Sequence, residues 1–494
     1  MNNNQFLLTT KIWESEKLFK KIGAFNLFLG EGFEYSSAIN TNTEIHLLGD
    51  MYDWENPKFG NSEILEHLLE YSELKISDLI NHTNKYCGEY VVIVKKRENI
   101  FLFNDACSQR EIYYADDFLS YGTQVKLIGN VCELKEHTDI DAQQFYQSEY
   151  FEKNKLHVGD RTHKKNVNHL LPNHFININE KKVERVSLPE ITKTKTIDIV
   201  AKKASSMLKG YLDAISNRKK ILLGLTAGYD SRVLFLASLG IKESKYYVNA
   251  TTDLNITEDH YDIQIAKKLA SIYKKELTII EKDWKKIKFS NPKSEQEYID
   301  DLDFPRFSNI GTETTDDEVI INGNISEIAR NYYGFHRGLT AEKLSFLNGC
   351  SNLKFAIRQY DKWLENQNNF EKLGYNILDM FYWEEKMGIW QSKTRTELYS
   401  LNRNVVTPYN SRDLLTLLLN TGRKNRDSHI NKLYRKIITE LSNHNIEVKN
   451  IPFNPCRKTR VILLLKYLNL YNLYRSSILK ISLIKRIVTK NKHH

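Results

Sequence analysis

Cysteine and proline are scarce in this sequence, and each shortage excludes certain classes of protein. Its 494 residues include 5 cysteines, 8 prolines and 21 glycines. The cysteines lie far apart and form no C-x-x-C pair, which argues against a zinc ribbon or a disulfide framework and favours a reducing compartment. With so little proline and glycine, collagen-like and linker-like chains are also excluded.

Long hydrophobic runs and a targeting segment are missing as well. The longest aliphatic runs are short, such as residues 461–465, whereas a membrane-spanning helix needs about 20 apolar residues. The first five residues have neither the basic start nor the apolar core of a signal peptide. We therefore expect a cytoplasmic protein. Hydrophobic residues make up 41% and charged residues 27%, so the chain is not disordered as a whole.

Acidic residues are absent from the end of the chain. Residues 457–494 hold ten Lys or Arg and no Asp or Glu, while the formal net charge of the whole chain is +9. By subtraction, residues 1–456 carry a net charge of −1. A uniformly basic nucleic-acid binder would not show this distribution, so we expect no nucleic-acid partner.

The basic tail at 457–494 also contains many apolar residues between its charges. This composition is typical of an amphipathic helix on an anionic membrane surface, which would give peripheral contact with the inner membrane face. A helix packed on the rest of the protein, with its basic side in solvent, fits the same pattern. Both interpretations remain open.

Hydrophobic periodicity divides the rest of the chain into two parts. The first part is predicted to be mostly β, with a helix at 62–71 and hairpins at 90–103 and 174–186. A polar segment at 193–198 follows. We therefore expect domains at 1–192 and 193–456, followed by the tail.

The second part predicts a parallel, doubly wound sheet. After an amphipathic helix at 199–215, strands and helices alternate, and this order is typical of βαβ units. The strands are expected at 221–225, 245–248, 276–280 and 318–322, with helices at 232–239 and 261–273. After about residue 340 only helices are expected.

The clearest candidate for a functional site is the loop after the first of these strands. Its sequence is Leu225-Thr226-Ala227-Gly228-Tyr229-Asp230-Ser231-Arg232. Ligands bind at the carboxyl ends of parallel strands, where small residues expose backbone N–H groups beside a helix N-terminus and form an anion site. Ala227 and Gly228 would let a phosphate approach closely. Thr226 and Ser231 would donate from their hydroxyls, and Asp230 would hold a magnesium ion that bridges phosphate oxygens. A structural βα turn with a capping side chain is the alternative.

At this point the sequence resembles a known family. Residues 226–231 resemble the S-G-G-x-D-S pyrophosphate loop of the N-type ATP pyrophosphatases, and their context resembles the asparagine synthetase and β-lactam synthetase superfamily. Residues 258–270 resemble the family's D-x-x-x-A-x-x-x-A helix, and residues 320–327 its second nucleotide motif, S-G-x-G-x-D-E. Residues 383–413 resemble its later helical part and residues 88–114 its glutaminase-like domain. The resemblance covers most of residues 40–456.

The resemblance implies a fold and a reaction. The fold would be an α+β, Ntn-like (glutaminase-like) β-sandwich domain, followed by an α/β doubly wound PP-loop synthetase domain, adenine nucleotide α-hydrolase-like, with a helical C-terminal part. The cofactors would be ATP and Mg²⁺. ATP would adenylate a carboxylate and release pyrophosphate, and an amine or ammonia would then displace AMP. The carboxylate would belong to a small molecule, a sugar acid or a peptide.

Two departures from the family pattern change the expectation. Mature asparagine synthetases begin with a cysteine that hydrolyses glutamine, whereas position 2 here is Asn2. We therefore expect the first domain to be a scaffold and substrate platform without glutaminase chemistry. In the second motif, Asn324 stands where the family has an acidic residue associated with handling ammonia. A neutral amide cannot act as a general base at pH 7.

The resemblance also implies site residues. Asp230 and Glu327 would be the metal ligands, and Arg232 would add a charge near the pyrophosphate. The adenine would sit against the strand-end residues Leu223, Leu225 and Val248. The remaining nucleotide contacts would come from Thr226, Ala227, Gly228, Ser231, Gly323 and Asn324.

Three catalytic residues are predicted with an open alternative for each. Arg330 would pair with a phosphate or be an ordinary surface arginine. Lys458 would assist the second step or simply begin the basic tail. Glu384, or its neighbour Glu385, would orient the amine or lie on a solvated helix face.

Two other functions remain open beside the ligase. A PP-loop nucleic-acid modification enzyme would use the tail to hold RNA and would show salt-sensitive binding. It usually carries a catalytic cysteine pair, which this sequence lacks. A non-catalytic ATP-binding scaffold is compatible with the altered loop and second motif.

Overall fold

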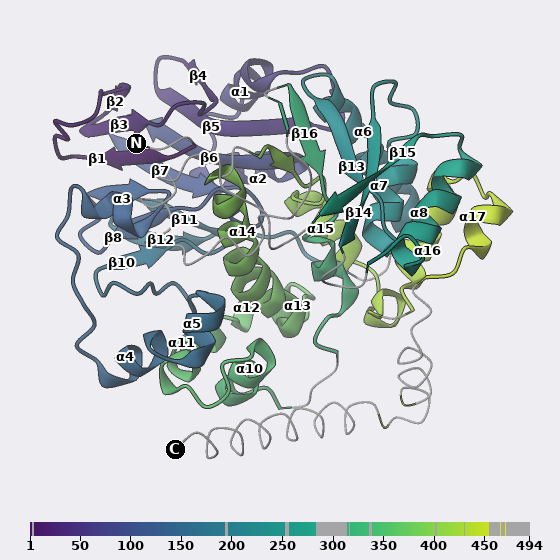
Figure 1. The fold of residues 1–494 in the computed structure, drawn as a ribbon. Coiled ribbons are helices and arrows are strands. Elements are labelled where there is room, and N and C mark those ends of the chain that lie inside the picture. Colours follow the sequence, from purple (N-terminus) through teal and green to yellow (C-terminus); the bar gives the residue numbers. More distant parts are fainter. Residues whose placement is uncertain are drawn as a thin grey trace.

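The two halves of the chain form different kinds of sheet (Figure 1). A computed structural model describes residue 1, residues 4–192, 196–251, 256–282, 314–315, 317–334, 338–400, 403–428 and 430–453, and residues 465 and 470. These ranges contain antiparallel sheets and a parallel sheet, so the protein is of mixed α/β class. No helix within them is long and apolar enough to cross a membrane. The predicted tail at 457–494 lies almost wholly outside the described residues.

The first half builds two antiparallel sheets, each with six described strands. Their orders are β10-β8-β9-β1-β3-β2 and β12-β11-β7-β6-β5-β4. The strands are β1 (Phe6–Thr9), β2 (Lys20–Ile22), β3 (Phe25–Leu29), β4 (Tyr35–Ile39), β5 (Thr43–Asp53), β6 (Tyr86–Lys96), β7 (Asn99–Asn104), β8 (Tyr113–Ala115), β9 (Ser120–Gly122), β10 (Val167–His169), β11 (His174–Asn177) and β12 (Lys182–Arg185). The helices are α1 (Asn61–Leu69), α2 (Ile76–His82), η1 (Thr83–Lys85), α3 (Val125–Gly129), α4 (Ile140–Tyr146) and α5 (Glu149–Asn154).

Apolar side chains on both faces of the second sheet explain how these layers stack. Successive residues of a strand point to opposite faces. In β6, Val91 and Ile93 pack against the first sheet, whereas Val92 and Val94 pack against α1 and α2. Helix α3 covers the outer face of the first sheet. The result is a four-layer arrangement of helices, sheet, sheet and helix.

The second half begins with α6 (Ile197–Ser216) and builds a parallel sheet of five described strands. Its order is β15-β14-β13-β16-β17. The strands are β13 (Lys220–Gly224), β14 (Lys245–Thr251), β15 (Leu277–Lys282), β16 (Glu318–Ile321) and β17 (Val405–Val406). The chain runs outward from β13 to β15 and then returns to the other side of β13. The strand order therefore reverses at β13, which is where open α/β sheets bind ligands.

Different helices pack on the two faces of the parallel sheet. Helices α6, α7 (Tyr229–Ala237) and α8 (Tyr261–Ile272) share one core with side chains such as Leu223 and Val248. On the other face, Leu222 and Ile320 pack with Leu398 of α14 (Gly388–Ser400). Residues 283–313, which join β15 to β16, lie outside the described ranges. The second helical layer expected of a doubly wound sheet is therefore described only in part.

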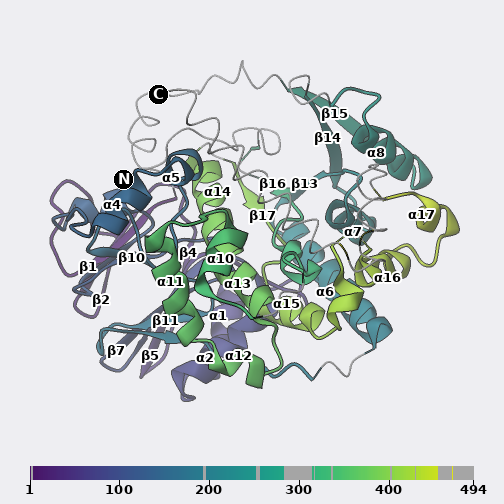
Figure 2. The ribbon, with the colours of Figure 1, turned by 90° about the horizontal axis from the view of Figure 1, so that it is seen from below.

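Helices after residue 340 lie beside both kinds of sheet, with α13 and α14 central in two views (Figures 1 and 2). The elements that remain are the 3-10 helices η3 (Ser326–Arg330) and η5 (Arg423–Arg426), the π-helix η4 (Tyr382–Met387), and α10 (Ala341–Asn348), α11 (Lys354–Glu365), α12 (Asn368–Lys372), α13 (Ile377–Phe381), α15 (Arg412–Leu419), α16 (Lys432–Leu441) and α17 (Ile446–Asn450).

Buried hydrogen bonds join this helical part to the antiparallel sheets. The Asn410 amide donates to the carbonyl of Gly88 (2.6 Å) and to the carboxylate of Asp105 (2.9 Å). The Arg412 guanidinium donates to the carbonyls of Asn104 and Asp105, both at 3.2 Å. Because a buried polar group without a partner costs about 1–3 kcal/mol, each half completes the hydrogen bonding of the other.

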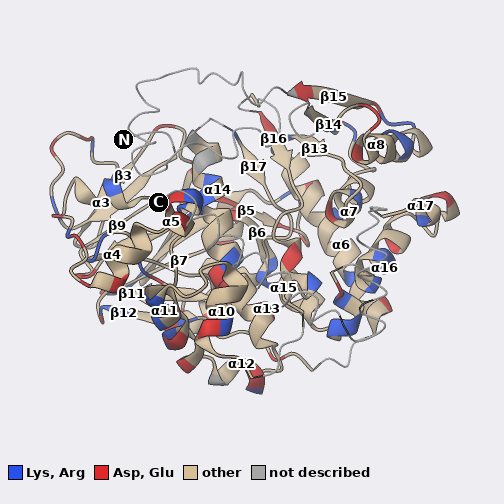
Figure 3. Cartoon of the chain, turned by 60° about the horizontal axis from the view of Figure 1, so that its bottom comes forward, with Lys and Arg blue, Asp and Glu red and all other residues tan. Residues whose placement is uncertain are grey.

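Residues of both charge signs occur along the described elements (Figure 3). Helix α10 carries Glu342 and Lys343, whereas α16 carries Lys432, Arg435 and Lys436 and one acidic residue, Glu440.

The predicted elements of the second half mostly match the described ones. The parallel strands and the helices at 199–215 and 261–273 are confirmed within a few residues. Helix α7 begins at Tyr229, three residues before the predicted start, because Gly228 is its N-cap. The prediction of helices alone after residue 340 is wrong at β17, a two-residue strand that pairs with β16.

Candidate nucleotide site

The loop after β13 is a compact turn closed by side-chain hydroxyls. The Ser231 hydroxyl lies 2.9 Å from that of Thr226 and accepts from the Thr226 backbone N–H at 3.1 Å. The Gly228 N–H donates to the Thr226 hydroxyl at 3.3 Å. Thr226 and Ser231 therefore hold the loop shape, and their hydroxyls already have partners inside it.

Helix α7 starts directly from this loop. Its N-cap is Gly228, which has no side chain to cap the first turn. The first N–H groups of a helix have no partner within the helix, and the helix dipole makes this end attractive to anions. The N-terminus of α7 therefore lies at the carboxyl end of β13, where the strand order reverses.

Asp230, in the first turn of α7, meets the end of β16. Its carboxylate accepts from the Ser326 hydroxyl at 2.5 Å and forms an ion pair with Arg330. A Cβ added to Gly323 would lie 2.4 Å from the Cβ of Asp230. Only glycine therefore allows α7 and the turn after β16 to approach this closely. The predicted residues Asp230, Gly323 and Arg330 are brought together.

The turn that carries these groups is strained. Ile325 is fully buried and has φ of +75°, a region that β-branched residues avoid. Such strain persists only where surrounding structure enforces it. Tyr434 of α16 contributes by donating from its hydroxyl to the Ser326 carbonyl at 3.0 Å.

Glu327 is the second predicted metal ligand. Burial raises its pKa to about 7, and its Oε2 atom is buried without a hydrogen-bond partner. An orphaned carboxylate oxygen next to Ser326 suits a cation. Mg²⁺ commonly uses one or two protein carboxylates together with substrate phosphates. Asp230 and Glu327 fit that donor set, provided that Arg330 leaves Asp230 for a phosphate.

Arg232 has a different place from the one predicted. It is fully buried, and its guanidinium donates to the carbonyls of Ala227 (3.3 Å), Ile451 (3.1 Å) and Pro452 (3.1 Å). It also lies 4.0 Å from the ring of Phe453. Burial lowers its pKa to about 10, so it stays charged at neutral pH. Arg232 therefore supports the loop from behind, and the prediction that it adds a charge near the pyrophosphate stays a prediction.

The predicted adenine surface is buried. Leu223 and Leu225 are 0% exposed and Val248 is 2% exposed, and all three belong to the main core. Their side chains have no free surface for a ring. An adenine at these strand ends would contact the backbone instead.

Glu384 and Glu385 lie in the π-helix η4 and face the antiparallel sheets. Glu384 is fully buried and accepts from Arg185 (2.6 Å), Asn173 (3.2 Å) and Trp363 (2.9 Å). These partners come from the first half and from α11, and none belongs to the loop at 225–232. The alternative of a solvated helix face is wrong, because both carboxyls are buried.

The last two predicted site residues are Asn324 and Lys458. Asn324 donates from its amide to Gln391 of α14 at 2.9 Å. Lys458 lies outside the described residues, so its predicted role stays a prediction.

Sequence reasoning missed several residues of the site. Asp262, at the start of α8, accepts from the Ala227 N–H at 2.9 Å and so ties α8 to the loop. The ring of Phe453 stacks on Tyr229 at 4.2 Å. Ser326 lies inside the second motif and could have been found from its position there. Phe453 lies 224 residues after Tyr229, and no local pattern links the two.

Comparisons with known proteins add little to this geometry. No protein-family model and no curated protein matches the chain. One solved structure that does is glutamine phosphoribosylpyrophosphate (PRPP) amidotransferase from B. subtilis, complexed with ADP and GMP. The match has 11% identity and a TM-score of 0.23, and it covers 56% of this chain and 85% of the other. A likeness this low supports no inference about fold or function.

Proposed function

We propose that this protein is an ATP-dependent amide-forming ligase of the asparagine synthetase type. It adenylates a substrate carboxylate, releases pyrophosphate, and passes the acyl group to an amine or to ammonia. Its nucleotide site is a PP-loop, formed by residues 225–232 with the second motif at 323–327. The substrate is a small-molecule, sugar-acid or peptide carboxylate.

One observation carries this proposal. A small-residue loop and an uncapped helix N-terminus lie at the strand-order reversal of a parallel sheet. There, Asp230 of this helix forms an ion pair with Arg330, which follows the neighbouring strand. Backbone N–H groups and a guanidinium suit phosphate oxygens, and a carboxylate suits a cation that bridges them. The constellation therefore fits a nucleoside triphosphate better than a neutral ligand.

The residues of the site have separable tasks in this proposal. The N–H groups at the start of α7 bind pyrophosphate oxygens, and Arg330 moves from Asp230 to a phosphate. Asp230 and Glu327 would hold Mg²⁺, and a bound Mg²⁺ would supply charge neutralisation for the leaving pyrophosphate. Ser326 and the Gly323 backbone keep Asp230 in place, so that the α-phosphorus and the carboxylate meet in line.

The fold of the first half supports a scaffold role in this reaction. Cys87, Cys107, Cys132 and Cys350 are all buried, and burial raises the pKa values of Cys87 and Cys107 well above the ordinary value. A buried neutral thiol is a poor nucleophile. The burial of these four cysteines supports the proposal that the first half has no glutaminase chemistry and that the amine comes from solution or from another protein.

The test measures pyrophosphate and AMP formation from ATP and Mg²⁺ with a panel of carboxylates and amines. Asp230→Asn is expected to lower AMP formation at least 100-fold, because the amide cannot hold the cation. Asp317→Asn is the matched control, since Asp317 is an exposed aspartate at the opposite end of β16, paired only with Lys220 and Thr315 in the described structure. Equal AMP formation by wild type and Asp230→Asn would refute the proposal.

A non-catalytic ATP-binding scaffold is the second candidate. It is favoured by the partners that the site residues already have. Asp230 forms an ion pair with Arg330, and the Ala227 N–H donates to Asp262. Calorimetry together with the AMP assay distinguishes the two candidates. A scaffold binds ATP with Mg²⁺ but forms no AMP with any carboxylate of the panel.

A further inference from the structure

Arg330 is the counter-ion of Asp230 in the structure. The two side chains form an ion pair and are 17% and 18% exposed. The guanidinium also donates to the Ser326 hydroxyl at 3.3 Å and lies 5.7 Å from the ring of Tyr434. The carboxylate of Asp230 is therefore neutralised by a side chain that Ser326 and Tyr434 hold in place.

This ion pair opposes the binding of a free divalent cation. At Asp230 a cation has to replace the guanidinium and meets its positive charge at short range. Asp230 and Glu327 supply two carboxylates, whereas Mg²⁺ takes about six oxygen ligands, several of them from water or phosphate. Within the described ranges, no group of three or more His, Cys, Asp or Glu side chains is arranged to hold a metal ion. The site therefore binds a cation weakly as long as no phosphate is present.

A phosphate group changes this balance because it gives Arg330 another anion. A guanidinium pairs bidentately with phosphate, and such charge-assisted hydrogen bonds are strong. The Nε atom of Arg330 is buried without a hydrogen-bond partner, so the side chain has a donor for this contact. Once the guanidinium turns to the phosphate, the carboxylate of Asp230 keeps the Ser326 hydroxyl as a donor but has lost its counter-ion.

We propose that Arg330 makes cation binding depend on nucleotide binding, because it blocks Asp230 against a free divalent cation until a phosphate takes the guanidinium. This inference rests on the proposed nucleotide site and adds an order of binding to it. By linkage, the phosphate and the cation strengthen each other's binding by the same factor. Arg330 therefore acts in the empty site as well as in the loaded one.

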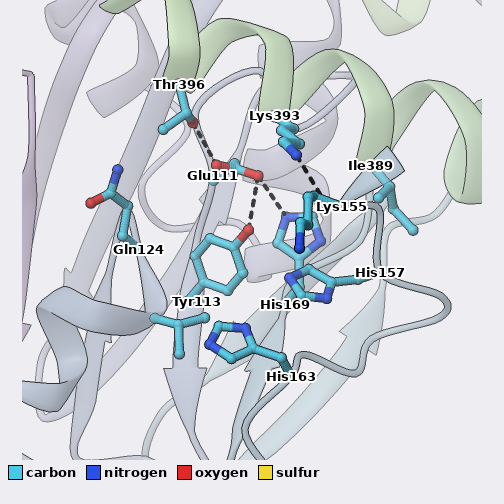
Figure 4. A pocket seen from close by; sticks show the side chains of 11 residues that line it. Glu111, Tyr113, Gln124, Lys155, His157, His163, His169, Ile389, Lys393 and Thr396 are labelled. Atoms are coloured by element: carbon cyan, nitrogen blue, oxygen red, sulfur yellow. Dashed lines mark hydrogen bonds and ion pairs between the residues drawn. The ribbon is translucent and has the colours of Figure 1, made fainter. Parts of the chain in front are cut away.

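The histidine-lined cavity between the antiparallel half and α14 is another candidate place for a free cation (Figure 4). His157, His163 and His169 line it together with Glu111. Glu111 already accepts from two hydroxyls. None of these four residues belongs to the loop at 225–232 or to the second motif at 323–327. The cavity is therefore a separate region against which the effect of Arg330 is measured.

The test measures Mn²⁺ binding to the full chain without nucleotide, by electron paramagnetic resonance of the free ion. Arg330→Met removes the charge and is expected to bind Mn²⁺ at least about 10-fold more tightly than wild type. A purely structural role of Arg330 predicts the opposite, a weaker site. The double variant Asp230→Asn with Arg330→Met should lose the gain, because the carboxylate is gone. Mg²⁺ should likewise raise the melting temperature of Arg330→Met but not that of wild type, since a ligand of the folded state stabilises it.

Two control variants keep the Asp230–Arg330 pair. Arg358→Met breaks an exposed arginine–aspartate pair of α11, and His169→Gln changes the histidine-lined cavity. Both should bind Mn²⁺ as wild type does. The inference is overturned if Arg330→Met binds Mn²⁺ no more tightly than wild type, if the double variant keeps the gain, or if either control shows the same gain. AMP formation tests the ligase separately, so a tighter Mn²⁺ site in Arg330→Met without AMP formation by wild type would refute the ligase alone.

Discussion

Gly323 is the closest point between the turn after β16 and helix α7. The missing side chain lets the first turn of α7 lie directly over the strand end, so that Asp230 reaches Ser326 and Arg330. Gly323 matters because a side chain would not fit between the two segments. Its backbone does not have the positive φ that favours glycine. A single methyl group would separate the loop at 225–232 from the second motif at 323–327.

Gly323→Ala is therefore expected to destabilise the fold by about 1–3 kcal/mol, the usual cost of overpacking. It should also weaken ATP binding at least 10-fold, because Asp230 moves away from Ser326. Urea unfolding and calorimetry with ATP measure the two effects. Gly240→Ala is the matched control, since a Cβ there meets no atom within 4 Å. Equal ATP affinity in both variants would contradict this account of Gly323.

At the scale of elements, the π-helix η4 places two neighbouring carboxyls in the interior. Glu384 has an arginine, an asparagine and a tryptophan as donors, whereas Glu385 has one described donor, the Gly159 N–H at 2.9 Å. The other oxygen of Glu385 is buried without a partner. Burial raises the pKa of Glu385 to about 8, with the Glu384 charge adding to the shift.

This arrangement predicts a pH dependence of stability. Between its ordinary pKa of 4.5 and the folded value of about 8, Glu385 holds a proton in the folded state and loses it on unfolding. Stability should therefore fall as pH rises through this window, by up to about 1.4 kcal/mol per pH unit. Glu385→Gln keeps an acceptor for Gly159 and should flatten the dependence. Urea unfolding from pH 5 to pH 8 measures it.

The control for this prediction is Glu365→Gln, at an exposed glutamate at the end of α11. It should keep the pH dependence of the wild type. A Glu385→Gln profile that runs parallel to the wild-type profile would show that Glu385 titrates normally.

At the scale of the whole molecule, a buried ion pair joins the two halves. Arg395 of α14 and Glu89 of β6 lie 2.6 Å apart and are 1% and 4% exposed. Tyr399 also donates to Glu89, and Arg395 continues to Thr407 and from there to Asn322 at the end of β16. The antiparallel half is thus linked by hydrogen bonds to the candidate nucleotide site.

Removing one partner of this pair should be more harmful than removing both. Arg395→Met leaves a buried carboxyl without its counter-charge and is expected to cost about 3–5 kcal/mol. The double variant Arg395→Met with Glu89→Gln should recover part of that loss. Lys95→Met, which breaks the half-exposed Lys95–Glu44 pair (2.7 Å), should cost less than about 1 kcal/mol. Chemical unfolding compares the four proteins.

The sequence predicts local features of the fold and site better than their assembly. Periodicity identified β13, α8 and the loop between β13 and α7, because each depends on residues close in the chain. It could not identify Arg185 as a partner of Glu384 or Ile451 as a partner of Arg232, since each of these contacts joins residues more than 190 positions apart. Nor could it show that the strand-end side chains Leu223 and Leu225 are buried, because burial depends on the helices packed over them.

The contact between Asn410 and Gly88 has a consequence for synthesis. The two residues are 322 positions apart, so at roughly 5–20 residues per second the ribosome adds Asn410 about 16–64 s after Gly88. Until then, the Gly88 carbonyl lacks its Asn410 donor and keeps water in its place, and the Asp105 carboxylate has only the backbone donors of its own half. The antiparallel half of a nascent chain is therefore a hydrated precursor, and it reaches its native core only when the last sixth of the protein has begun to emerge.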